Sequence, residues 1–162
     1  MESITHVPLL RQGPDGSRPV TDALAVEEPL ELRLDGHPIS VLMRTPGHDM
    51  ELAAGFLVTE GIIHAMAQVR KIAPRRDENR VLVFLEDDVE VDLARLTRHL
   101  FTGSSCGLCG KATLDAILTH SPRISASLEV PDEVLLSAPD KLRERQAIFE
   151  TTGGLHAAGL FS

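Results

Sequence analysis

The sequence predicts an α+β protein whose N-terminal part is rich in strands and contains one long helix. Three features support this fold class: two alternating segments joined by a tight turn, a stretch with helical spacing of apolar residues, and a second pair of strand-like segments. They lie at residues 30–43, 48–60 and 69–85, respectively. Alternation with a period of two is typical of a half-buried strand, whereas spacing of three and four residues is typical of a helix with one buried face.

Composition sets limits on the class of protein. The chain has 162 residues, of which 43% are hydrophobic, enough for a core, but Trp and Tyr are absent and the core must therefore be largely aliphatic. The formal charge of −8 argues against broad nucleic-acid binding, which needs a basic surface. No apolar run approaches the length of a membrane span, and the first residues lack the basic and apolar regions of a signal peptide. We expect a cytoplasmic protein that binds neither nucleic acid nor membrane.

The N-terminal part divides into a leader and a domain. Residues 1–19 are polar and interrupted by Pro and Gly, so we expect a flexible leader, followed by an α+β domain over residues 20–100. In that domain, residues 30–34 and 39–43 alternate on either side of Asp35-Gly36, which predicts a β-hairpin.

The long helix is expected at 48–60. Thr45-Pro46 supplies a hydroxyl for the N-cap and a proline for the first turn, and Gly61 ends the helix. Two strands follow at 69–73 and 80–85, and a short helix is expected over 92–99.

The C-terminal part shows a weaker pattern. Helices are expected over 108–119 and 137–149, with an extended segment at 123–136 between them and a strand at 155–161. A final apolar strand without a following partner predicts that the sequence stops partway through a second layer of structure.

Both cysteines lie in one glycine- and serine-rich stretch, residues 101–111, which we expect to be a mobile loop. Cys106 and Cys109 are spaced C-x-x-C, and Lys111 follows directly, ahead of an apolar helical run. A nearby lysine and a helix N-terminus both stabilise a thiolate relative to a thiol. The pattern therefore favours a nucleophilic sulfur.

Two other interpretations of the cysteines remain open. A zinc site needs four ligands, and the chain has one cysteine pair, which histidines at non-finger spacings or a second chain would have to complete. A thioredoxin-type redox pair should follow a strand in a βαβ pattern, which the Gly-Ser context fits poorly. His156 lies in Leu155-His156-Ala157-Ala158, which lacks the glutamate of zinc nucleobase deaminases, so we exclude deamination.

Five blocks of sequence, in order, resemble the formate dehydrogenase accessory sulfurtransferases of the FdhD type. They are Val26-Glu27-Glu28-Pro29-Leu30, Arg44-Thr45-Pro46, the stretch from Glu51 to Ile63 containing Gly55-Phe56-Leu57-Val58-Thr59-Glu60-Gly61, Ser104-Ser105-Cys106-Gly107-Leu108-Cys109-Gly110-Lys111, and Thr152-Gly153-Gly154-Leu155-His156-Ala157-Ala158.

The resemblance implies a function and a second domain. Members of that family accept sulfane sulfur from a cysteine desulfurase as a cysteine persulfide, and pass it to the molybdenum or tungsten bis-molybdopterin guanine dinucleotide cofactor that formate dehydrogenase requires. By this resemblance Cys106 carries the persulfide, Cys109 is its partner, and the cofactor is bound only transiently. It also implies that residues 112–162 are the opening of a cytidine-deaminase-like α/β domain and that the protein forms a homodimer.

The resemblance covers only the N-terminal portion of the family. Family chains continue through a Gly-Arg-His-Asn block and a glycine-rich segment that contributes to the guanine nucleotide site, and neither occurs here. The cofactor-binding residues are therefore left unassigned, and no metal ligand is assigned. Two alternatives to the sulfurtransferase are kept: a truncated, non-catalytic interaction protein and a zinc-binding module.

Overall fold

The computed structural model describes residues 2–14, 16–92, 125 and 127–161. It divides into two compact units. We call Glu27–Pro122 the central unit, and Met1–Val26 together with Arg123–Ser162 the terminal unit. Each is described by itself.

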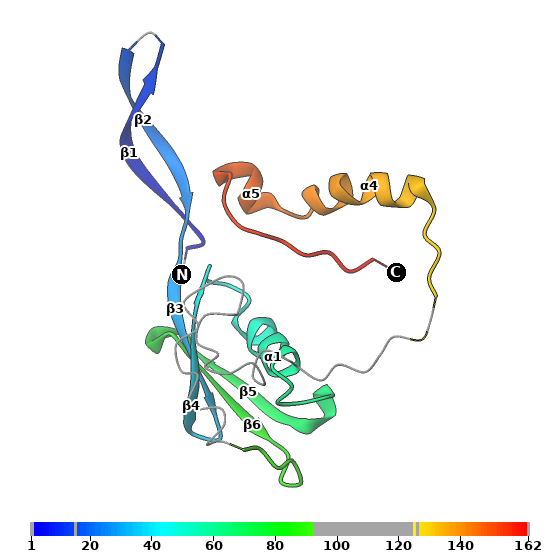
Figure 1. The fold of residues 1–162 in the computed structure, drawn as a ribbon. Coiled ribbons are helices and arrows are strands. Elements are labelled where there is room, and N and C mark those ends of the chain that lie inside the picture. Colours follow the sequence, from blue (N-terminus) through cyan, green and yellow to red (C-terminus); the bar gives the residue numbers. More distant parts are fainter. Residues whose placement is uncertain (1, 15, 93–124, 126, 162) are drawn as a thin grey trace. The chain divides into compact units, whose positions relative to one another are not determined.

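The central unit contains a four-stranded sheet of order β4-β3-β6-β5 (Figure 1). Its strands are β3 (Glu28–Leu34), β4 (His37–Arg44), β5 (Val69–Arg75) and β6 (Arg80–Leu85). β3–β4 and β5–β6 are antiparallel pairs, and β3 and β6 join them in parallel at the centre of the sheet. A parallel junction needs a crossover connection, and α1 (Asp49–Thr59) lies within it. All four predicted strands are confirmed.

The turn between β3 and β4 confirms the predicted hairpin. Asp35 and Gly36 both have positive φ, at 46° and 86°. Two successive positive φ values give the twist that matches right-handed strands, and an Asp-Gly pair is the common way to obtain it.

The helix α1 is confirmed, but its predicted cap is wrong. The cap residue is His48, which makes no side-chain cap bond, and the buried Thr45 hydroxyl has no hydrogen-bond partner among the described residues. The backbone at Gly47, with φ 144°, separates Thr45-Pro46 from the first turn. The C-terminal prediction holds, because Gly61 has φ 67° and its N–H donates to the Val58 carbonyl.

The core of the central unit is aliphatic, as composition predicted. Alternate residues of β3 and β6 lie on the face that contacts α1, and α1 contributes Ala53 and Leu57. The buried hydrophobic residues are Leu30, Leu32, Leu34, Ile39, Ala53, Leu57, Ile63, Val81, Val83 and Leu85.

The terminal unit begins with a long hairpin, which corrects the expectation of a flexible leader over residues 1–19. β1 (Ile4–Gly13) pairs antiparallel with β2 (Gly16–Ala25), and β2 runs through the predicted boundary at residue 20. The N–H of Val26 donates to the Ser3 carbonyl, so these two opposite residues form a hydrogen-bonded pair. Hydrogen-bonded and non-hydrogen-bonded pairs alternate along an antiparallel ladder, which places Pro8 and Pro19 each in a non-hydrogen-bonded pair. Their missing N–H groups therefore point to the outer edges, where a proline is tolerated.

The helices of the terminal unit also differ from the prediction. α4 (Asp132–Arg143) starts within the segment expected to be extended, and a break precedes α5 (Ala147–Thr152), where one helix over 137–149 was expected. Asp132 and Glu133 place negative charge in the first turn after Pro131, which favours a start there, and Pro139 is accommodated inside α4.

The remaining predictions for the C-terminal part have mixed outcomes. Gly153, with φ 68°, ends α5, and residues 155–161 form no strand, which corrects the strand expected there. The helices expected at 92–99 and 108–119 lie, except for residue 92, outside the described residues. The cytidine-deaminase-like domain stays a prediction.

Candidate functional site

The residues predicted to carry the chemistry, Cys106, Cys109 and Lys111, lie outside the described residues. His156 is described, and it is exposed in the segment that follows α5. Within the part of the chain that the structure describes, no group of three or more His, Cys, Asp or Glu side chains is arranged to hold a metal ion.

Two of the blocks that carry the family resemblance meet at Arg44, the last residue of β4. The Arg44 Nε donates to Asp49 Oδ1 at 2.8 Å, and Nη2 lies 3.4 Å from Asp49 Oδ2, so the guanidinium binds the carboxylate with two nitrogens. Nη1 lies 3.3 Å from Glu28 Oε2, at the start of β3. Nη2 also donates to Asn79 Oδ1 at 3.0 Å.

The charged groups of this cluster are largely buried, so their pairing matters for the stability of the central unit. The side chains of Arg44 and Asp49 are 5% and 8% exposed, and that of Glu28 is 32% exposed. A buried charge is costly unless it is paired and hydrogen-bonded, and here each guanidinium nitrogen has a partner. The cluster connects the first residue of β3, the last of β4, the first turn of α1 and the residue before β6, so it fixes these elements relative to one another.

Sequence reasoning did not find the Arg44 cluster. The available signal was Arg44 directly after a strand pattern, with an acidic residue at the start of the following helix. Its two carboxylates are bound by the Arg44 guanidinium, so the cluster holds the elements that carry them together.

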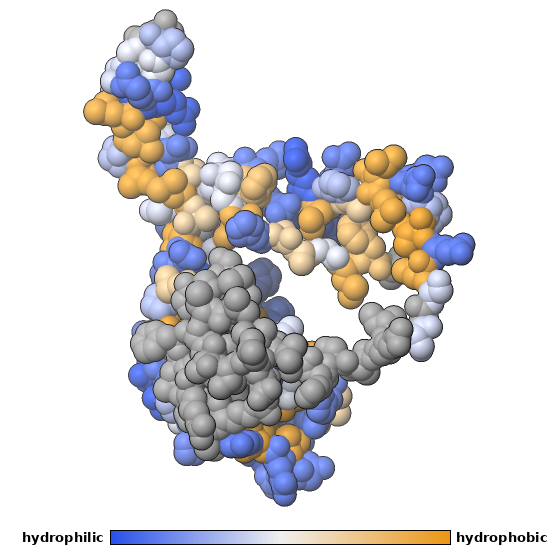
Figure 2. Space-filling model, viewed as in Figure 1, coloured by the Kyte–Doolittle hydropathy of each residue, from blue (hydrophilic) through white to orange (hydrophobic). Residues whose placement is uncertain are grey.

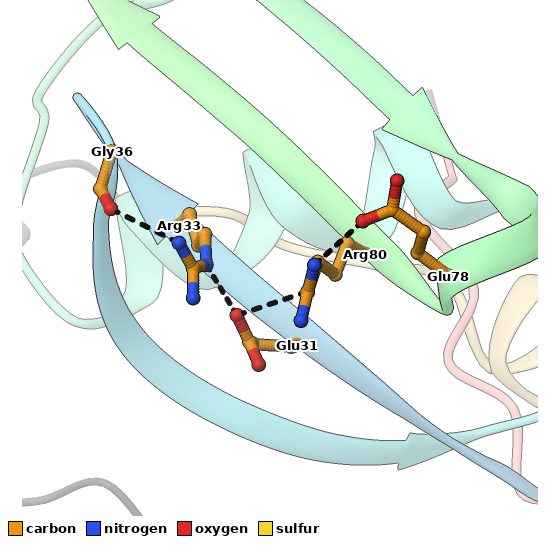
Figure 3. Close-up of polar contacts among 5 residues, drawn as sticks. All are labelled: Glu31, Arg33, Gly36, Glu78 and Arg80. Atoms are coloured by element: carbon orange, nitrogen blue, oxygen red, sulfur yellow. Dashed lines mark hydrogen bonds and ion pairs between the residues drawn. The ribbon is translucent and has the colours of Figure 1, made fainter.

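A second polar array lies on the sheet face that points away from α1 (Figure 3). Glu31 lies between two arginines: it pairs with the Arg33 Nε, and its Oε1 is 3.3 Å from the Arg80 Nε. Arg80 Nη1 also binds Glu78 Oε2 at 2.6 Å, and Arg33 Nη1 donates to the Gly36 carbonyl at 3.4 Å. These side chains are about one third to one half exposed, so each pair is worth little in stability.

The helices of the described residues include none long and apolar enough to cross a membrane.

Comparison with known proteins gives matches over nearly the whole chain. The model of the FdhD/NarQ family matches residues 25–162. A protein from Streptomyces coelicolor named "Sulfur carrier protein FdhD" is 43% identical over 164 residues, which cover 94% of this chain and 57% of the relative. Proteins of the same name from Mycolicibacterium paratuberculosis and Sulfolobus acidocaldarius are 43% and 40% identical, covering 98% and 87% of this chain and 60% and 52% of the relatives. The chain thus spans a little over half the length of these relatives.

One solved structure supports the fold. A chain from Desulfotalea psychrophila, provisionally described as a formate dehydrogenase accessory protein, superimposes with a TM-score of 0.52 at 23% identity. The superposition covers 57% of this chain and 38% of that one.

Proposed function

Because the chain belongs to the FdhD/NarQ family, we propose that it is a sulfur carrier that acts in the maturation of formate dehydrogenase. The observation that supports this most directly is the extent of the match. Relatives named as sulfur carriers are 38–43% identical over most of the chain, and the family match includes the segment with Cys106 and Cys109.

The reaction that we propose is an exchange between a thiolate and a persulfide. The Cys106 thiolate attacks the outer sulfur of a cysteine persulfide on the donor, a cysteine desulfurase. A new S–S bond forms on Cys106, the S–S bond of the donor breaks, and the donor cysteine leaves as a thiolate. The proton on the transferred sulfur stays with it, so the exchange needs no external oxidant or reductant.

Several residues around Cys106 suit this step. Gly103, Gly107 and Gly110 leave little side-chain bulk near the sulfur, which two different partners must reach. The charge of Lys111 favours the thiolate that attacks, and Cys109 is the partner thiol. The recipient in this proposal is the bis-molybdopterin guanine dinucleotide cofactor of formate dehydrogenase, which is the substrate that accepts the sulfur.

A second candidate is a non-catalytic interaction protein, which binds the desulfurase or formate dehydrogenase without carrying sulfur. A third is a zinc module in which two chains contribute four thiolates. Metal analysis of the purified protein separates the third candidate from the others.

The experiment that tests the proposal is intact-protein mass spectrometry after incubation with a cysteine desulfurase and cysteine. We expect one added, reducible sulfur on the wild-type chain and none on Cys106→Ala. Circular dichroism on both proteins serves as the folding control. A folded, metal-free wild-type protein that acquires no sulfur would contradict the carrier function, and the non-catalytic interaction protein would then be the remaining candidate.

A further inference from the structure

Four basic side chains share the sheet face that points away from α1. In the β5–β6 pair Lys71 is opposite Phe84 and Arg75 is opposite Arg80, and residues directly opposite each other lie on the same face. Arg33 is linked to Arg80 through Glu31. We call Arg33, Lys71, Arg75 and Arg80 the basic face.

The charge of this face differs from that of its surroundings. Over residues 27–92 acidic side chains outnumber basic ones by 14 to 7, yet four of those seven lie on the basic face. Two of the other three are committed elsewhere, since Arg44 is buried and Arg70 binds Asp87 at 2.7 Å. Positive charge is thus concentrated on one surface of an acidic unit.

Two of the four cations have no counter-charge among the described residues. Glu31 and Glu78 pair with Arg33 and Arg80, whereas Lys71 and Arg75 are exposed and form no ion pair with a described side chain. Arg75 stands directly opposite Arg80, whose charge Glu31 and Glu78 already compensate. An anionic group supplied from outside would give Lys71 and Arg75 the counter-charge that Arg80 has.

The centre of the same face is apolar. Ala73 pairs with Leu82 across β5–β6, next to Phe84, and all three are half-buried. An apolar centre surrounded by polar side chains, with arginine well represented, is the usual anatomy of a protein–protein interface. A nucleic acid or an anionic membrane fits less well, because the excess of acidic side chains around the face repels an extended polyanion.

We propose that the basic face is the surface on which the persulfide-bearing donor protein docks, through acidic side chains around an apolar patch of its own. This inference rests on the proposed function. We assign the donor because attack by Cys106 is the step in which this chain's own thiolate is the nucleophile, and its own surface must therefore bring the donor's sulfur within reach. Lys71 and Arg75 speed the encounter electrostatically, since complementary charge acts mainly on the association rate.

The test compares two double charge reversals on the full chain. Lys71→Glu with Arg75→Glu alters the basic face, and Lys141→Glu with Arg145→Glu makes the same change of charge on exposed residues of the terminal unit. With a cysteine desulfurase as the probe, we expect sulfur loading of the basic-face variant to be roughly tenfold slower than wild type at low salt. The control should stay within about twofold of wild type, because the two variants have equal net charge and only the position of the reversal differs. Raising the salt concentration should slow the wild type and bring the two variants together.

Binding of the desulfurase to Cys106→Ala protein, with and without the basic-face reversals, tests docking without the chemistry. Loss of affinity specific to the reversals supports the docking surface even if no sulfur is transferred, in which case only the carrier function fails. Equal loading rates and equal affinities for the two double variants would overturn the docking surface while leaving the carrier function intact. A reversal that slows delivery to formate dehydrogenase but not loading would overturn the assignment to the donor.

Discussion

The two units differ most in what they bury. Every buried hydrophobic residue of the described chain belongs to the central unit, whereas no described residue of the terminal unit is buried. Ten of the fourteen large hydrophobic residues that are exposed lie in the terminal unit, and Figure 2 shows such apolar surface around its helices. These ten are Leu10, Leu24, Leu128, Val134, Leu135, Leu136, Phe149, Leu155, Leu160 and Phe161.

This difference shows that a segment can form regular secondary structure without forming a hydrophobic core. The hairpin β1–β2 has 10-residue strands in full register, yet a two-stranded ribbon is marginal in water by itself, and the short helix α5, which contacts β2, has no buried residue. The central sheet has shorter strands but is covered on one face by α1. Stability in the described chain should therefore be concentrated in the central unit.

The largest effect should come from removing the buried guanidinium of the central unit. Arg44→Ala leaves the buried carboxylate of Asp49 without its partner, and breaking such a pair costs about 3–5 kcal/mol. The matched control is Arg33→Ala, whose ion pair is about one third exposed and should cost about 1 kcal/mol or less. Because the chain has no Trp or Tyr, urea unfolding followed by circular dichroism is the measurement. Equal losses for the two variants would mean that the Arg44 cluster does not hold the central unit together.

A leucine truncation in each unit compares their packing directly. Leu57→Ala removes a fully buried side chain and should lower the free energy of unfolding by about 2–5 kcal/mol. Leu142, on α4, is only partly buried, so Leu142→Ala should cost about 1 kcal/mol or less. Comparable losses would show that the terminal unit has a core of its own.

The sequence predicted the central unit far better than the terminal one, for a physical reason. In the central unit β3 has one face on the core, so burial imposes the alternation that was read from residues 30–34. In β1 the strand forms without a buried face, and Pro8 and Gly13 suggested a loop where the hairpin has proline on its outer edge. The Arg44 cluster was missed because it joins residues up to 35 positions apart, which no local pattern reveals.

The candidate site was predicted from the residue types around the cysteines and from the order of the sequence blocks along the chain, not from the positions of side chains in space. The cysteine spacing and the adjacent lysine indicate a reactive sulfur, but the choice of sulfur transfer over zinc or redox chemistry came from the resemblance. Cys106 and Cys109 therefore stay predictions until sulfur loading is measured.

The smallest effects should come from replacing one turn glycine in each unit by alanine. Because the two substitutions add similar backbone strain, any difference between their effects reflects the difference between the two units. Gly36 and Gly16 both have positive φ, 86° and 101°, and a β-carbon added at either would meet no atom within 4 Å. An alanine therefore costs only backbone strain, about 1 kcal/mol in each turn. In the central unit that cost should appear in global unfolding, because β3 and β4 belong to the cooperative core. In the terminal unit we expect it instead as faster hydrogen exchange of the β1–β2 amides, with the central transition unchanged. Native-state hydrogen exchange of the full chain, resolved into peptides by mass spectrometry, measures the global and the local effect together. A Gly16→Ala effect that spreads equally to the β3 and β6 amides would show that the two units unfold together.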